Sequence, residues 1–249
     1  MHLIFIILIM LFLPVRAGAA MAAQACEGNV FEGLPYTLCS VDPARSVMRI
    51  YHGDAGGKAF GSFDSLIRQL WRERHYLIVA MNGGMYHQDL SPVGLFVEHG
   101  IERHAISTKA GWGNFHLLPN GVFWLKDGRA GVTETARYLK ERRSADYATQ
   151  SGPMLVIDGA IHPRFLPESD SLKIRNGIGV DAEGRVHMVV SEAPVRFYDF
   201  ARLFRDRLGC RNALYLDGTI SSLYAAENGR RDHFFPLGPI IAVIGTVPQ

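Results

Sequence analysis

The sequence predicts an α+β fold, a single domain with a mixed, largely antiparallel sheet and a few packed helices. Three observations predict it: four pairs of apolar segments joined by short glycine-containing turns, three segments with helical periodicity, and no linker or charge run between residues 26 and 249. With 48% hydrophobic and 20% charged residues among 249, the chain is apolar enough to bury a core. One domain is therefore expected after residue 25.

Four β-hairpins are predicted where apolar or aromatic segments flank a short turn. The turns are His99-Gly100 after residues 93–98, Asp127-Gly128 after 121–126, Asp158-Gly159 after 155–157, and Glu183-Gly184 between 178–181 and 186–191. Because so short a turn joins antiparallel strands, at least part of the sheet must be antiparallel.

Helical periodicity marks residues 63–74, 133–143 and 198–208, the last followed by Gly209 in the position of a C-terminal cap. The first helix leads into an apolar strand at 76–81 that ends in Asn82-Gly83-Gly84, and the third leads into a strand at 213–216 that ends in Asp217-Gly218. Ligands commonly bind at the carboxyl ends of such strands, although both dipeptides also suit ordinary tight turns.

The N-terminus resembles an export signal. Residues 3–15 are almost wholly apolar, and small residues lead to the triplet Ala23-Gln24-Ala25, which suits signal peptidase. We therefore expect residues 1–25 to be a cleaved signal peptide, the only segment that contacts a membrane, and the mature chain to be periplasmic or secreted. An uncleaved membrane anchor and lipidation of Cys26 stay open as alternatives.

Three cysteines occur in the chain. In an oxidising compartment Cys26 and Cys39 can close a small loop that fixes the mature N-terminus, which stabilises the fold by about 3 kcal/mol for a loop of this size. Cys210 is then left as a free, buried thiol.

Several functional classes lose support at the sequence level. The net charge of +2 leaves no electrostatic surplus for nucleic-acid binding. The signatures of serine hydrolases, nucleotide triphosphatases, zincins and EF-hands do not occur. His99, His104 and His116 have no acidic partner at ligand spacing, and the segment from His87 to Asp89 is better explained as a loop wall. We therefore predict no metal site and no cofactor.

Four strings stand together in order along the chain. They are Asn82-Gly83-Gly84-Met85-Tyr86, Gln150-Ser151-Gly152-Pro153-Met154-Leu155-Val156, Arg175-Asn176-Gly177-Ile178-Gly179-Val180 and Asn212-Ala213-Leu214-Tyr215-Leu216-Asp217-Gly218. The ordered set resembles the phosphodiester glycosidase domain family, in particular its bacterial exported branch, over residues 42–247. The resemblance implies hydrolysis of a sugar C1–O bond whose leaving group is a phosphate ester. The animal enzymes of the family have further glycines where this chain has Thr219 and Ile220, so the sugar is not predicted.

This reaction suggests roles for the matching residues. It needs a carboxylate at the anomeric carbon, for which Asp217 is the first candidate and Glu192 the second. The departing anion needs positive or NH-rich recognition, which Arg175 and the backbone at Gly83, Gly84 and Gly152 can supply. Asn82 and Gln150 suit sugar hydroxyls. Ser151, Gly218 and Ser221 complete the expected substrate-binding set, with Ser221 or Ser222 orienting Asp217.

The sequence predicts an exported hydrolase of glycosyl phosphodiesters in an envelope or extracellular polysaccharide, with Asn82, Gln150, Arg175 and Asp217 converging in one cleft. Two other hypotheses stay open. One is a non-catalytic protein of carbohydrate binding or envelope polysaccharide assembly, and the other is a phosphodiesterase that cleaves the P–O bond. The oligomeric state is not predicted.

Overall fold

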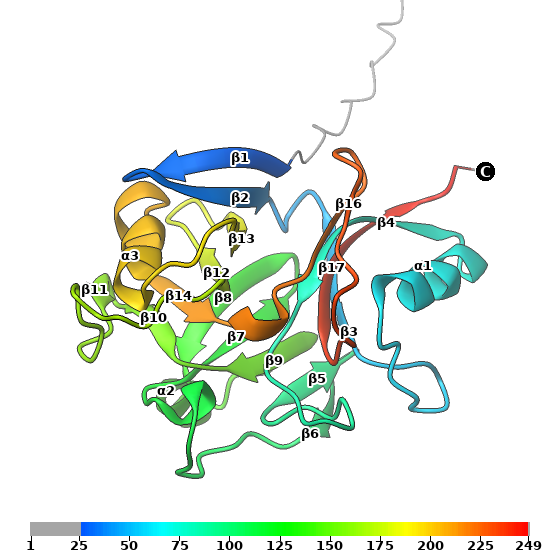
Figure 1. The fold of residues 1–249 in the computed structure, drawn as a ribbon. Coiled ribbons are helices and arrows are strands. Elements are labelled where there is room, and N and C mark those ends of the chain that lie inside the picture. Colours follow the sequence, from blue (N-terminus) through cyan, green and yellow to red (C-terminus); the bar gives the residue numbers. More distant parts are fainter. Residues whose placement is uncertain (1–25, 249) are drawn as a thin grey trace, which may run out of the picture.

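The computed structural model describes residues 26–248 and folds them into three sheets (Figure 1). The largest has seven strands in the order β1-β2-β13-β12-β14-β10-β11. Its strands are β1 (Cys26–Phe31), β2 (Leu34–Val41), β10 (Met154–Ile157), β11 (Ala160–Ile161), β12 (Asn176–Val180), β13 (Val186–Ser191) and β14 (Asn212–Tyr215). The first half of this sheet thus joins the N-terminal hairpin to strands from the last third of the chain.

The other two sheets have five strands each, in the orders β16-β15-β4-β17-β3 and β6-β5-β9-β7-β8. The former contains β3 (Val47–Tyr51), β4 (His75–Asn82), β15 (Leu223–Ala225), β16 (Arg230–Arg231) and β17 (Ile240–Thr246). The latter contains β5 (Phe96–Glu98), β6 (Ile101–His104), β7 (Gly121–Lys126), β8 (Arg129–Glu134) and β9 (Tyr147–Ser151). Between residues 26 and 248, every strand pairing within the three sheets is antiparallel.

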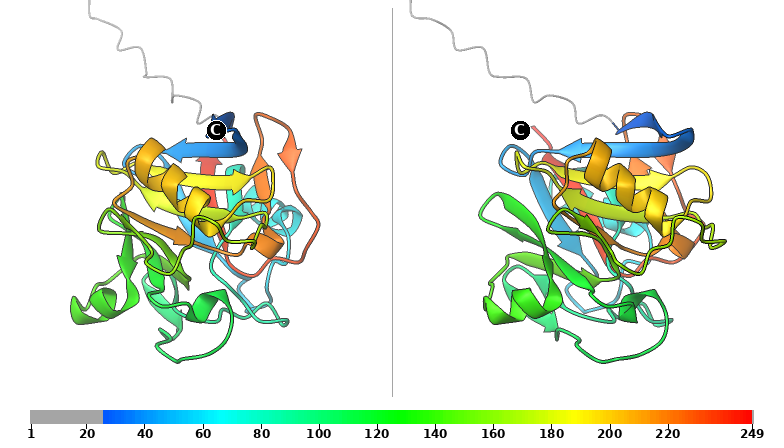
Figure 2. Two further views of the ribbon diagram at one scale, coloured as in Figure 1. Left: turned by 60° about the vertical axis from the view of Figure 1, so that its left-hand side comes forward. Right: turned by 90° about the vertical axis from the view of Figure 1, so that its left-hand side faces the viewer.

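One apolar core lies between the three sheets. It includes Met188 of the seven-stranded sheet, Met81 and Val243 of the second sheet, and Phe123 of the third, all buried. Side chains on alternate positions of a strand point to opposite faces, so each sheet sends one set of residues into this core and has a second set for its outer face. The two views of Figure 2 show the sheets from further sides.

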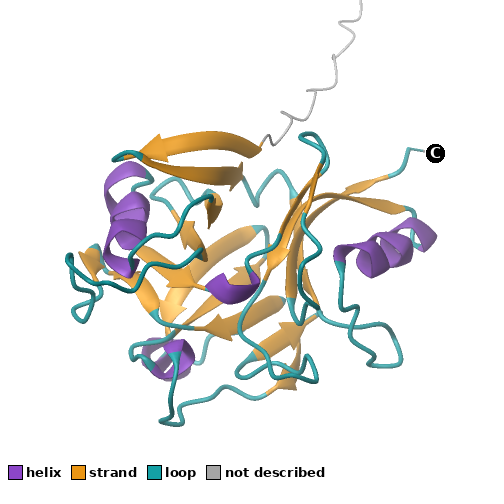
Figure 3. Ribbon diagram, viewed as in Figure 1, coloured by secondary structure: helices purple, strands orange, loops and turns teal. Residues whose placement is uncertain are grey.

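Helices lie on the outer faces of the sheets (Figure 3). Helix α1 (Phe63–Arg72) begins at Ser62, whose side chain accepts a hydrogen bond from the Ser65 amide, and it packs Leu66 and Leu70 against the second sheet. Helix α3 (Phe197–Arg202) continues into the π-helical turn η2 (Leu203–Arg207) over the seven-stranded sheet, and α2 (Thr135–Lys140) lies beside the third sheet. Two short 3₁₀ turns, η1 (Asn114–His116) and η3 (Gly218–Ile220), complete the elements.

The predicted α+β class and all four hairpins are confirmed. The sequence did not show that the strands divide among three sheets. The second predicted helix begins too early, because Thr133 pairs with Val122 in β8 and the helix starts only at Thr135. Threonine is β-branched and suits a strand, so the hairpin extends at the expense of the helix.

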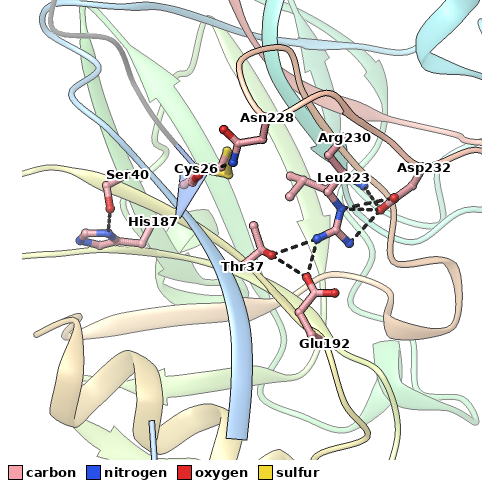
Figure 4. Close-up of a disulfide and its surroundings, with 10 residues drawn as sticks. Cys26, Thr37, Ser40, His187, Glu192, Leu223, Asn228, Arg230 and Asp232 are labelled. Carbon is pink, nitrogen blue, oxygen red and sulfur yellow. Dashed lines mark hydrogen bonds and ion pairs between the residues drawn. A yellow bond between two sulfur atoms is a disulfide. The ribbon is translucent and has the colours of Figure 1, made fainter. Parts of the chain in front are cut away.

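The predicted Cys26–Cys39 disulfide is confirmed, and Cys210 is a free, buried cysteine. Cys26 and Cys39 are direct partners across β1 and β2, with Cα atoms 4.2 Å apart, so the bond fixes the edge strand to its neighbour (Figure 4). Burial raises the pKa of the Cys210 thiol to about 12, which keeps it protonated and unreactive. The predicted signal peptide, residues 1–25, lies outside the described residues. Among residues 26–248, no helix is both long and apolar enough to cross a membrane.

Candidate active site

Polar residues at strand ends meet where the three sheets come together. Asn82 ends β4 of the second sheet, Ser151 ends β9 of the third, and Asn176 begins β12 of the seven-stranded sheet. Asp217 follows β14 and precedes η3. The site is therefore assembled from segments that are distant in sequence, and its central contacts are the side-chain amides of two asparagines.

The Asn82 and Asn176 amides form one buried network. Asn176 donates from Nδ2 to Oδ1 of Asn82 over 2.8 Å, and its own Oδ1 accepts the Asp217 backbone amide at 2.9 Å. Oδ1 of Asn82 also accepts the Ser222 amide at 2.9 Å, and its Nδ2 donates to the Asp217 carbonyl at 3.4 Å. Both asparagines are 0% exposed. Because buried amides are costly to leave unpaired, this network fixes the backbone on both sides of η3.

Asp217 itself is only partly buried, and its extended backbone begins the η3 turn. Burial raises the pKa of its carboxyl to about 6, against a hydrogen bond from the Thr219 backbone amide that lowers it. A carboxyl with this pKa is mostly ionised at neutral pH and can still exchange a proton there. Perturbation by burial at the end of a strand is typical of functional carboxylates.

Two tyrosines lie near this carboxylate. Burial raises the pKa of Tyr86 and of Tyr215, and in both the negative charge of Asp217 raises it further. The Tyr215 hydroxyl accepts the Gly218 amide at 2.6 Å, and the Tyr86 hydroxyl donates to the Pro236 carbonyl at 2.5 Å. Both phenols are therefore neutral at physiological pH and form part of the surroundings of Asp217.

Two glycines allow the close approach of these segments. A Cβ atom on Gly218 would lie 2.3 Å from the Ile174 carbonyl oxygen and 2.6 Å from the Tyr215 hydroxyl. A Cβ atom on Gly84 would lie 2.2 Å from the Gln150 carbonyl oxygen, where the Gly84 amide instead donates to Oγ1 of Thr149 at 3.1 Å. The Gly83 amide donates to the Pro239 carbonyl at 2.7 Å. Neither amide is aimed at an open space.

Arg175 lies next to Asn176 in sequence, but its side chain lies against α3 on the outer face of the seven-stranded sheet. It is 1% exposed, donates to the carbonyls of Val195 and Ser171 at 2.9 Å each, and stacks 3.5 Å above the Phe197 ring. Burial lowers its pKa. Recognition of the leaving anion by Arg175 stays a prediction, and these contacts also suit a structural role.

Gln150 and Ser151 are likewise bonded within the protein. The Gln150 Oε1 atom accepts the amides of Leu95 and Ser107 at 2.9 Å each, and its Nε2 donates to the Ser107 carbonyl at 2.7 Å and to Thr135 Oγ1 at 3.1 Å. The Ser151 hydroxyl donates to the Leu216 carbonyl at 2.8 Å. Gln150 thus ties a loop to the third sheet, and Ser151 ties that sheet to the end of β14.

Glu192 and Ser221 both line a small pocket of about 260 Å³ beside Gly218. The Glu192 carboxylate accepts from Oγ1 of Thr37 at 2.6 Å and forms an ion pair with Arg230 (Figure 4). The Ser221 hydroxyl donates to the Gly218 carbonyl at 2.9 Å, so it shapes the turn after Asp217. Its predicted orientation of the Asp217 carboxylate and the catalytic role of Glu192 stay predictions.

The structure thus joins Asn82 directly to Asp217. The Gln150 side chain bonds to a separate loop, and the Arg175 guanidinium contacts Tyr215, whose hydroxyl accepts the Gly218 amide. Four residues of this region were not predicted from the sequence: Asn176, Tyr86, Tyr215 and Arg230. The sequence did contain a signal for Asn176. Side chains two positions apart on a strand point to the same face, so Asn176 is a polar residue on the same side as the core residue Ile178. The histidines considered as metal ligands bond instead to protein atoms: His99 to Tyr147, His104 to Gly94 and His116 to Lys109.

Known proteins are similar to this chain over most of its length. A sequence model of the family described as phosphodiester glycosidase matches residues 75–243, a range that holds Asn82, Asn176 and Asp217. The chain is 34% identical over 204 residues to the uncharacterized protein YigE of Escherichia coli strain K12, covering 82% of this chain and 80% of that one. The chain belongs to the phosphodiester glycosidase family.

Solved structures share the fold of this chain. The catalytic domain of zebrafish N-acetylglucosamine-1-phosphodiester alpha-N-acetylglucosaminidase, solved in a form auto-inhibited by its pro-peptide, superposes with a TM-score of 0.62 at 15% identity, over 88% of this chain and 81% of that one. A hypothetical protein from Synechocystis has a TM-score of 0.57 at 14% identity, over 88% and 61% of the two chains. A putative exported protein from Burkholderia pseudomallei K96243 has a TM-score of 0.54 at 11% identity, over 84% and 74%.

Membership in the phosphodiester glycosidase family supports a glycosidase-type hydrolase with a carbohydrate-type substrate. For that chemistry the site offers one perturbed carboxyl, Asp217, whose backbone is fixed from both sides and whose surroundings include two neutral phenols.

Proposed function

We propose that this chain is an exported hydrolase that cleaves the C1–O bond of a glycosyl phosphodiester in an envelope or extracellular polysaccharide. The observation that carries the proposal is Asp217: its backbone is held by the buried Asn82–Asn176 pair, and burial raises its pKa to about 6. Family membership supplies the class of bond. Export is supported by the Cys26–Cys39 disulfide, because such bonds persist in oxidising compartments.

Asp217 suits the anomeric centre for an electrostatic reason. As the C1–O bond lengthens, positive charge develops on C1 and the ring oxygen, and a nearby carboxylate stabilises this charge more in the transition state than in the bound substrate. At pH 7 a carboxyl with a pKa of about 6 is mostly ionised. The same partial burial that raises its pKa also strengthens its attraction for a developing cation.

The leaving group explains why a second carboxylic acid is less important here. A phosphate monoester departs as an anion without full protonation, whereas an alcohol needs a general acid. Water then adds its oxygen to C1 and loses a proton, giving the free sugar and a phosphomonoester. Asp217 either attacks C1 as phosphate leaves, forming a glycosyl ester that water then hydrolyses to restore the carboxylate, or accepts the proton from water that attacks C1 directly. The proposal holds for both routes.

An isotope experiment tests the class of reaction. The wild-type protein is incubated in oxygen-18 water with methyl phosphodiesters of neutral sugars in both anomeric forms, and the methyl phosphate product is examined by phosphorus NMR and mass spectrometry. C1–O cleavage leaves this product unlabelled, because water oxygen enters the sugar. Label in the phosphate means P–O cleavage and contradicts the proposal, and binding without release of any product supports a non-catalytic carbohydrate-binding protein instead.

A further inference from the structure

The pocket beside Gly218 contains two exposed phenylalanines and a charged cluster that the mechanism above does not use. It has a volume of about 260 Å³, and Phe234, Phe235, Glu192, Arg230 and Asp232 line it together with the turn that follows Asp217. We propose, building on the proposed function, that this pocket binds one neutral sugar ring, whose face packs on the phenylalanines and whose hydroxyls donate to the carboxylates. That ring is the sugar released at Asp217.

The two phenylalanines are exposed but anchored. Phe234 is 71% and Phe235 is 48% exposed, a large apolar surface for two adjacent side chains. Their segment is held on one side by the Asp232 amide, which donates to the Leu223 carbonyl at 3.1 Å. On the other side the Tyr86 hydroxyl donates to the Pro236 carbonyl, and the Leu237 amide donates to the Gly61 carbonyl at 2.9 Å. Their exposure is thus a feature of a fixed segment, ready to pack on the apolar face of a ring.

The charged cluster presents acceptors to such a ring. Arg230 donates to Asp232 at 3.0 Å and to Oγ1 of Thr37 at 3.0 Å, and it forms an ion pair with Glu192 (Figure 4). These protein partners occupy the guanidinium, which leaves it less able to recruit an anion. In Glu192, both the Thr37 and the Arg230 bonds go to Oε1. Its Oε2 is therefore oriented by the ion pair and able to accept from a sugar hydroxyl.

The net charge of the cluster favours a neutral sugar over an anionic one. Two carboxylates and one guanidinium give the cluster a net charge of −1, so a uronate or a phosphate placed in the pocket would meet like charge. The volume is below the roughly 300–1,000 Å³ typical of sites for drug-sized ligands, which suits a single ring. The phosphate of the substrate then lies on the other side of the scissile bond, away from Glu192 and Asp232.

Binding of simple glycosides tests this pocket without any need for turnover. The probes are methyl glycosides of glucose, galactose, mannose and N-acetylglucosamine, with methyl glucuronide as the anionic probe, each titrated into the full chain and followed by ligand-observed NMR. We expect at least one neutral glycoside to bind and the glucuronide to bind more weakly. Phe235→Ala and Phe234→Ala should each weaken the neutral ligand about fivefold to tenfold. Trp71→Ala is the matched control, because Trp71 is 66% exposed on α1 outside the pocket and its loss should change nothing.

A second variant tests the charge argument. Glu192→Gln keeps the shape of the side chain and removes one negative charge, so it should narrow the gap between the neutral glycoside and the glucuronide. The inference is overturned if no neutral glycoside binds, if both phenylalanine variants bind like wild type, or if the glucuronide binds more tightly than every neutral probe. If glycosides bind but no phosphodiester is hydrolysed, the sugar-binding pocket is supported and the proposed hydrolase activity is contradicted. If phosphodiesters are hydrolysed and KM is unchanged in both phenylalanine variants, the hydrolase activity is supported and the sugar-binding pocket is contradicted.

Discussion

The side-chain amide of Asn176 donates to Oδ1 of Asn82 over 2.8 Å, although the two residues are 94 positions apart in the chain. The same Asn176 side chain accepts the backbone amide of Asp217, and Asn82 accepts that of Ser222. The seven-stranded sheet and the second sheet are thereby linked at the point where the candidate catalytic carboxylate begins its turn. We propose that these two asparagines position Asp217, and a direct contact of Asn82 with substrate stays a prediction.

Asn176→Ala should therefore lower the stability of the fold and change the pKa of the Asp217 carboxyl. It removes the hydrogen bond to Asn82 and leaves the Asp217 amide without its acceptor, so the free energy of unfolding should fall by about 1–3 kcal/mol. The acid limb of the pH–rate profile should also move from its position near pH 6, because the surroundings of Asp217 change. Asn212→Ala, at the end of β14 away from Asp217, removes hydrogen bonds to Asp158 and should leave that limb in place. An unshifted limb in both variants would contradict positioning by Asn176.

Asp217→Asn should stabilise the fold at neutral and alkaline pH. The carboxyl binds its proton more tightly in the folded chain, with a pKa of about 6, than in the unfolded chain, where it is 3.8. Its ionisation therefore costs stability progressively as the pH rises from 3.8 through 6, by about 3 kcal/mol above that range. Asparagine carries no such cost. Urea unfolding should show the variant more stable than wild type at pH 8 and equal to it below pH 4, whereas an equal difference at both pH values would exclude the raised pKa.

Gly218→Ala tests the close approach of the turn after Asp217. The added Cβ would lie 2.3 Å from a backbone oxygen that cannot easily move, so we expect a loss of stability of about 1–3 kcal/mol and reduced turnover. Gly28→Ala in β1 is the matched control, since a Cβ there meets nothing within 4 Å. Thermal melting and activity of the two variants provide the comparison. Equal behaviour of both would show that the turn has room to relax.

Arg175→Ala distinguishes a structural arginine from an anion-binding one. The side chain is buried, stacks on Phe197 and donates to two carbonyls, so its removal should lower the free energy of unfolding by about 2–4 kcal/mol. Activity per folded molecule should then fall only modestly. If Arg175 instead binds the leaving phosphate, KM should rise and kcat should fall while the melting temperature stays near that of the wild type.

Local patterns in the sequence predicted the hairpins, because a glycine turn and its flanking apolar residues are neighbours in the chain. The division into three sheets could not be predicted this way, since pairings such as β4 with β17 join segments more than 150 residues apart. The start of the second helix was predicted two residues too early for a related reason. Thr133 pairs with Val122 across the hairpin, and this pairing, not the local spacing of apolar residues, decides its conformation.

In the candidate site, too, local sequence patterns predicted some residues but not the contacts between distant segments. Asp217 and Asn82 could be selected because each is followed by glycine at the end of an apolar strand. Asn176 is adjacent to Arg175 in sequence, and we assigned the functional role to Arg175 because it is charged. The Arg175 side chain, however, lies on the face of the sheet opposite to that of Asn176. The pairing of β12 with β14 places the Asn176 side chain against the Asp217 backbone, and the contact with Asn82 links it to the second sheet. Gln150 bonds instead to a separate loop.

The most direct measurement of the central claim is the rate of phosphomonoester release by Asp217→Asn at pH 8, on a glycosyl phosphodiester that the wild type cleaves, with binding followed by calorimetry. We expect a rate at least about a hundredfold lower and nearly unchanged affinity, because the lost charge acts mainly in the transition state. Asp158→Asn is the matched control: it alters the other predicted Asp-Gly turn, whose aspartate pairs with Arg137, and should retain full activity. Near-wild-type turnover by Asp217→Asn would show that Asp217 is not the catalytic carboxylate and would leave Glu192 as the candidate.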